Sequence, residues 1–100
     1  MARLDLHAMP GGQPGYVVDV QADLLSDLVT RTVLPLLPEG DAPRPISELN
    51  PIFEIDGRRH VLLTQAIASI PGRELKKAVG SLSNHHDQIA RALDVLLLGF

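Results

Sequence analysis

The chain has 100 residues, of which 45% are hydrophobic, and it carries a formal net charge of -3 at pH 7. A chain of this length is expected to fold as one domain, residues 1–100, that buries roughly two-thirds of its unfolded surface without metals or cross-links. It contains no cysteine, which excludes disulfides and a thiol nucleophile, and its acidic balance with scattered Lys and Arg disfavours direct nucleic-acid binding.

The first two predicted elements form a hairpin. The stretch ARLDLHAM alternates apolar and polar residues, a period-2 pattern that predicts a half-buried strand on which His7 is half-exposed. PGGQPG breaks this strand, because proline and glycine favour turns, and YVVDVQ predicts a second strand. Asp19 and Gln21 share a face of it, and we interpret them as cross-strand or loop-pinning hydrogen-bonding residues.

The middle of the chain predicts further strands. DLLSDLV fits a turn or a short helix, whereas TRTVLPLL predicts a strand that Pro35 confines to a sheet edge or a bulge. PEGDAPRPISELN predicts a surface loop. PIFEIDGRRHVLLT predicts a hairpin with Asp56 and Gly57 in a type I′ turn, and with His60 half-exposed. These patterns give about five strands in all.

Two helices are predicted near the end of the chain. IPGRELKKAV predicts a short helix from about Pro71. The closing segment predicts a longer helix, capped by Ser83 or Asn84 and with Asp87 in its first turn. Its apolar residues have the spacing of one core-facing stripe: Ile89, Ala92, Leu93, Leu96, Leu97 and Phe100. The inferred architecture is mainly β, an antiparallel sheet with a C-terminal α-helix.

Leu98 does not belong to this stripe. At about 100° per residue it lies about 180° from Ile89, on the helix face that carries Asp87, Arg91 and Asp94. With Val95 one turn earlier it can form a small apolar patch, which we interpret as a contact surface. The alternative is a terminal surface leucine without a role, since single exposed leucines are ordinary.

Several stretches, in order along almost the whole chain, resemble the CcdB family of bacterial toxins: VDVQAD, RTVLPL, PIFEIDG, AIASIP and SNHHDQIARALDVLLLGF. The resemblance implies an SH3-like small barrel with an additional three-stranded antiparallel sheet and a C-terminal helix, related in fold to MazF. It also implies a homodimer without enzymatic activity. Such a toxin binds the A subunit of DNA gyrase, traps the cleaved-DNA complex, and is neutralised by a CcdA-like antitoxin.

The family residues that poison gyrase are a terminal Trp-Gly-Ile. By resemblance they correspond to Leu98, Gly99 and Phe100, so the tryptophan is replaced by leucine and the glycine is retained. Glycine there lets the chain leave helical geometry at little cost. The expected gyrase-binding residues are therefore Leu98, Gly99, Phe100 and Val95.

Two alternative functions remain open. One is a CcdB-fold module that binds an antitoxin but does not poison gyrase. The other is a MazF-like RNA endonuclease, whose acid, base and cation would come from Asp56, Arg58 and Arg59, or from a second set. That second set is Asp27, Thr30 and Arg31.

We expect no metal and no cofactor. His85 and His86 are adjacent on a helix, so their side chains diverge by about 100° and cannot converge on one ion. The N-terminal residues lack the apolar run of a secretory signal, and no stretch approaches the length of a membrane span. A cytoplasmic protein that makes no membrane contact is therefore expected.

Overall fold

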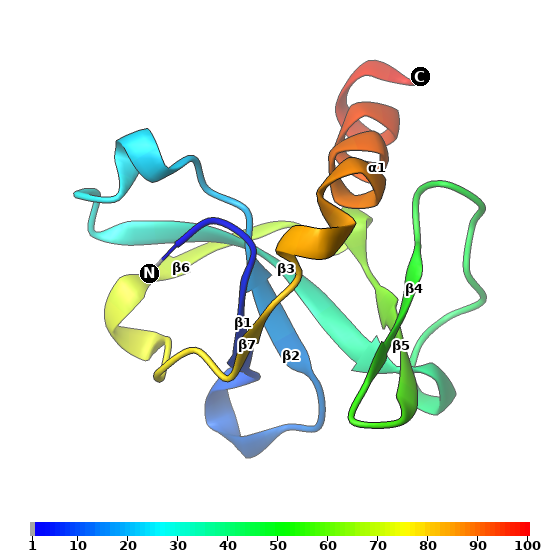
Figure 1. Ribbon diagram of the computed structural model, residues 1–100, viewed down its shortest axis with the longest axis horizontal. Coiled ribbons are helices and arrows are strands. Elements are labelled where there is room, and N and C mark those ends of the chain that lie inside the picture. Colours follow the sequence, from blue (N-terminus) through cyan, green and yellow to red (C-terminus); the bar gives the residue numbers. More distant parts are fainter. Residues whose placement is uncertain (1) are drawn as a thin grey trace.

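The computed structural model describes residues 2–100. Its elements are mainly strands, followed by one α-helix at the C-terminal end (Figure 1), as predicted. In chain order they are β1 (Asp5–Ala8), β2 (Tyr16–Asp19), β3 (Thr30–Pro38), β4 (Ile52–Ile55), β5 (Arg58–Leu62), β6 (Ala68–Pro71), β7 (Gly80–Ser81) and α1 (His86–Leu98). No helix of these residues combines the length and the apolar character needed to cross a membrane.

All strand pairs are antiparallel, and the strand order is β4-β5-β3-β2-β1-β7, with β6 also paired to β3. Strand β3 is nine residues long, and it pairs with strands in both parts of the sheet. One of its edges pairs first with β6, through residues 30–33, and then with β5, through residues 36–38. The sheet therefore splits along β3 and curls into a half-barrel.

Both predicted hairpins are confirmed. In the first, β1 pairs with β2 in a register that places Leu6 opposite Val18. In the second, β4 and β5 are joined by Asp56 and Gly57, whose φ angles are +51° and +78°. Type I′ turns require positive φ at both central positions, which the Asp-Gly pair supplies.

The prediction for Pro35 is wrong, because β3 lies at the centre of the sheet. Proline is tolerated there because it lies where one edge of β3 changes partner from β6 to β5. Its carbonyl accepts a hydrogen bond from the Leu63 N–H at 2.8 Å, and the donor that proline lacks would face the same edge. The break in pairing therefore accommodates the missing N–H.

The predicted count of five strands is too low, and the helix predicted from Pro71 is wrong. Residues 68–71 instead form β6, paired with Thr30–Val33 of β3, and only a 3₁₀ turn follows at Gly72–Glu74. Strand β7 has two residues, paired with β1. The DLLSDLV stretch, left open above, contains a 3₁₀ turn at Asp23–Leu25.

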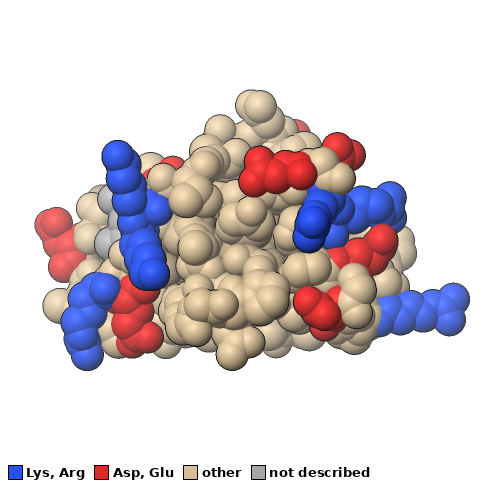
Figure 2. Space-filling model, turned by 90° about the horizontal axis from the view of Figure 1, so that it is seen from below, with Lys and Arg blue, Asp and Glu red and all other residues tan. Residues whose placement is uncertain are grey.

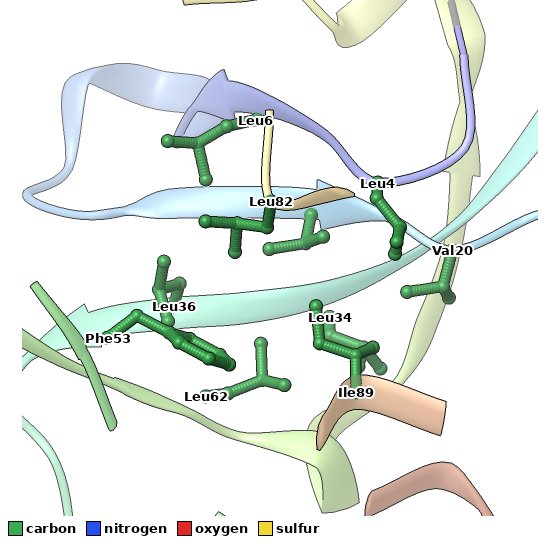
Figure 3. Packing of buried hydrophobic residues seen from close by; sticks show 10 residues of the cluster. Leu4, Leu6, Val20, Leu34, Leu36, Phe53, Leu62, Leu82 and Ile89 are labelled. Carbon is green, nitrogen blue, oxygen red and sulfur yellow. The ribbon is translucent and has the colours of Figure 1, made fainter. Parts of the chain in front are cut away.

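Ten buried apolar side chains form the core, and Figure 3 shows how they interdigitate between the sheet and the start of α1. They are Leu4, Leu6, Val18, Val20, Leu34, Leu36, Phe53, Leu62, Leu82 and Ile89. Ile89 is the residue that α1 contributes. The helix is thus attached to the core through its first turns.

His7 and His60 are buried, not half-exposed as predicted. His7 is 1% exposed because the segment around Lys76 crosses its face, where His7 Nδ1 lies 2.6 Å from the Lys76 carbonyl oxygen. His60 is 5% exposed and packs edge-to-face against Tyr16. Periodicity identifies the core face of a strand, but it does not reveal what covers the other face.

Helix α1 differs from the prediction at both ends. Ser83 and Asn84 do not cap it but form a 3₁₀ turn before it, and His85 occupies the N-cap position without a side-chain hydrogen bond. Asp87 does lie in the first turn, as predicted.

Only the first part of the apolar stripe is buried. Ile89 and Ala92 are fully covered, whereas Leu97 and Phe100 are 68% and 73% exposed. The last turns of α1 project beyond the sheet (Figure 1), so no core remains for them to face.

Candidate partner-binding site

The projecting end of α1, which we call the helix tip, comprises Val95, Leu98, Gly99 and Phe100. Leu98 is 61% exposed, Phe100 is 73% exposed, and Val95 is half-buried. The structure therefore places all four expected residues together at one protruding end. It also exposes Leu97, which the helical stripe had assigned to the core.

Gly99 ends the helix in the left-handed conformation, with φ +82° and ψ +7°. Its N–H donates to the carbonyl oxygens of Asp94 and Val95, each at 3.1 Å. No atom lies within 4 Å of a Cβ built at this position, so the backbone conformation, and not space, favours glycine. The resulting turn directs Phe100 away from the core stripe.

The charges beside the helix tip are mainly acidic. Arg91 is bound to Glu48, with Nη2 3.0 Å from Oε2, and the Asp87 carboxylate lies 3.3 Å from His86 Nδ1. Asp94, one turn before Leu98, takes part in no ion pair among residues 2–100. A complementary partner surface would be apolar, with a cation at its rim.

The base of α1 rests on a loop that hydrogen bonds hold firmly. The Asn50 amide donates to the Leu62 carbonyl at 2.9 Å and to Gln65 Oε1 at 2.7 Å, while its oxygen accepts from the Ile46 N–H at 3.0 Å. The Thr64 hydroxyl donates to the carbonyl of the neighbouring loop at 2.6 Å. The exposed Arg91–Glu48 pair adds one contact between the helix and this loop, while the tip projects.

Asp19 and Gln21 are the pinning residues that the sequence predicts. Asp19 accepts from the Gln21 N–H at 3.0 Å and from Arg31 Nε at 2.9 Å. Gln21 donates to the Leu25 carbonyl at 2.8 Å and accepts from the Thr32 N–H at 3.0 Å. Arg31 is 1% exposed, so the catalytic set built on it has no access to a substrate.

The other set proposed for RNA cleavage, Asp56, Arg58 and Arg59, is divided. Asp56 and Arg58 line a pocket of about 450 Å³ together with His60, whereas Arg59 is paired with Glu39 at 3.0 Å. Sequence reasoning missed His60 here, because only the fold brings it beside Tyr16 from another strand. Within residues 2–100, no group of three or more His, Asp and Glu side chains is placed to hold a metal ion.

Comparisons with known proteins agree with this architecture. Among solved structures, the toxin MazF-mt6 of Mycobacterium tuberculosis matches with a TM-score of 0.75 and 15% identity, over 92% of this chain and 94% of that chain. A mycobacterial endoribonuclease in complex with its cognate antitoxin matches with a TM-score of 0.79 and 14% identity, over 100% and 96% of the two chains. The chain therefore has the CcdB/MazF fold.

The sequence itself identifies the family within this fold. The family model described as CcdB protein matches residues 3–99, nearly the whole chain. The chain belongs to the CcdB family. Among curated proteins, no sequence matches it.

Proposed function

We propose that this protein is the toxin of a type II toxin-antitoxin system and that it poisons DNA gyrase by binding the A subunit through the helix tip. Family membership and the toxin fold support the toxin role. The exposure of Leu98 and Phe100 at a projecting helix end is the observation that supports gyrase as the target. The mechanism is binding without chemistry, and it takes place in the cytoplasm.

Phe100 takes over the aromatic role at the tip. The family places tryptophan where this chain has Leu98, and leucine offers less contact area and no π-face. Phe100 supplies an aromatic ring two residues later, and the turn at Gly99 leaves it 73% exposed. A cation on the partner can then meet this ring.

Supercoiling and DNA-cleavage assays with purified gyrase test the proposal. We expect inhibition by the protein, and we expect Phe100→Ala to weaken gyrase binding by about 2 kcal/mol or more, roughly thirtyfold, as is typical for a hot-spot aromatic residue. Leu98→Trp should strengthen binding. Val79→Ala is the matched control, because Val79 is also 61% exposed but lies outside the tip.

If saturating protein does not inhibit gyrase, the proposal of gyrase poisoning is wrong, and the antitoxin-binding module is favoured. An unchanged affinity in both Phe100→Ala and Leu98→Trp would show that the tip is not the anchor. Incubation with labelled RNA tests the nuclease alternative, and we expect no cleavage, because Arg31 is buried and Arg59 is paired elsewhere.

A CcdA-like antitoxin is the proposed neutralising partner, and the toxin is proposed to act as a homodimer. A short gene for an acidic, partly disordered protein immediately upstream would support this pairing. Expression of the protein alone should arrest growth and alter plasmid supercoiling, and co-expression of that upstream gene should restore both. Growth arrest that the upstream gene does not relieve would contradict the pairing.

A further inference from the structure

The β1–β2 turn and the β4–β5 hairpin border a pocket of about 450 Å³ that the proposed function does not use. These two turns lie at the end of the molecule opposite the helix tip (Figure 1). Figure 2 looks at this end and shows mainly uncharged side chains across its middle, with charged groups at the sides. Gly15 lines the pocket and lies close to β3, because a Cβ there would be 2.6 Å from the Leu36 carbonyl oxygen.

His60 lines this pocket. Its Nδ1 lies 3.0 Å from the Arg58 carbonyl oxygen, and a carbonyl only accepts, so Nδ1 carries the proton and Nε2 of the neutral ring is an acceptor. The ring is 5% exposed and is held edge-to-face by Tyr16, with centroids 5.3 Å apart. The acceptor is therefore fixed in orientation before any ligand binds.

Two side chains of opposite charge stand beside His60. Arg58 and Asp56 both line the pocket, both are exposed, and neither takes part in an ion pair among residues 2–100. Arg59, the next residue, differs in that Glu39 neutralises it. The remaining wall is apolar and includes Pro14, Pro38 and Ile55.

We propose that this pocket binds a free nucleoside 5′-monophosphate. The Arg58 guanidinium binds the phosphate, for which its fork of N–H donors is suited. The Asp56 carboxylate accepts from the ribose hydroxyls. The base packs against Tyr16 and the prolines, and one of its N–H groups donates to His60 Nε2. The inference is independent of gyrase binding, because it uses no residue of the helix tip.

The charges favour one nucleotide over a nucleic-acid chain. Arg58 and Asp56 leave the pocket without net charge, and the whole chain carries -3. A polyanion needs clustered cations along its path, and this rim offers one unpaired arginine. A single phosphate needs only that residue.

NMR titration with adenosine, guanosine, cytidine and uridine 5′-monophosphates tests the site. Tyr16 is the only tyrosine of the chain, so its ring signals need no separate assignment. We expect at least one nucleotide to shift the Tyr16 and His60 ring signals saturably. We expect Arg58→Ala to weaken that nucleotide about tenfold or more, and Arg59→Ala to change its affinity less than about twofold.

Five results would overturn the proposal, and the first four concern the small ligands. They are no saturable shift with any of the four nucleotides, equal weakening by Arg58→Ala and Arg59→Ala, binding of ribose 5-phosphate as tight as that of the nucleotide, and equally tight binding of the nucleoside without phosphate. In the last experiment, a uridine trinucleotide is titrated in the same way. If it binds more tightly than every monophosphate, the commitment to a free nucleotide is wrong.

Discussion

At the scale of single residues, burial distinguishes two ion pairs of the same chemistry. The side chains of Arg31 and Asp19 are 1% and 0% exposed, whereas those of Arg59 and Glu39 are 60% and 46% exposed. Removing one partner of a buried pair leaves an uncompensated charge, at a cost of about 3–5 kcal/mol. An exposed pair contributes only about 0–1 kcal/mol.

We therefore predict that Asp19→Ala lowers the free energy of unfolding by about 3–5 kcal/mol. The substitution leaves the buried Arg31 charge without its partner and removes the acceptor of the Gln21 N–H. Glu39→Ala, the matched control, should lower it by less than about 1 kcal/mol. Urea unfolding followed by circular dichroism measures both changes. Equal midpoint shifts for the two variants would contradict the assigned importance of the buried pair.

At the scale of elements, the sequence predicts what local chemistry determines. The β4–β5 hairpin follows from Asp56 and Gly57, which supply the positive φ of its turn. Strands β6 and β7 were missed, because their pairing with β3 and β1 joins segments far apart in the chain. Pro35 was misplaced for the same reason, since only the fold shows where β3 changes partner.

Helix α1 and its tip also have one feature that the local sequence predicts and one that only the fold reveals. The exposure of Leu98 follows from helical geometry alone, at about 100° per residue. The exposure of Phe100 does not, because a helical stripe assumes that the core extends along the whole helix. Here α1 extends beyond the sheet, and Gly99 then changes the direction of the chain.

Gly99→Ala tests this turn. Alanine at φ +82° costs about 1 kcal/mol locally, so we predict that the last turn rearranges and that Phe100 loses its direction. Gyrase affinity should fall, while the midpoint of thermal unfolding stays nearly unchanged, because the tip lies outside the core. Gly40→Ala is the control: Gly40 also has open space for a Cβ, but its φ is not positive. Full gyrase affinity in Gly99→Ala would show that the turn does not position Phe100.

At the scale of the whole molecule, one chain exposes large apolar side chains outside the helix tip as well as within it. Ten large apolar side chains are exposed among residues 2–100, and four of them lie within residues 24–29. Clusters of exposed apolar side chains, as at residues 24–29, mark interaction sites more often than single ones do. The tip accounts for only part of this surface, so a second contact is expected, which agrees with the proposed homodimer.

Self-association in solution tests this prediction. The Cα radius of gyration of one chain is 12.6 Å, close to the roughly 13 Å of a compact 100-residue monomer. We predict that small-angle scattering gives a clearly larger radius and that sedimentation gives the mass of two chains. Because a dimer that poisons gyrase must leave its tips free, Phe100→Ala should not change that mass. A single-chain mass at micromolar concentration, or dissociation caused by Phe100→Ala, would contradict a dimer with free tips, since the second result would place the tip inside the interface.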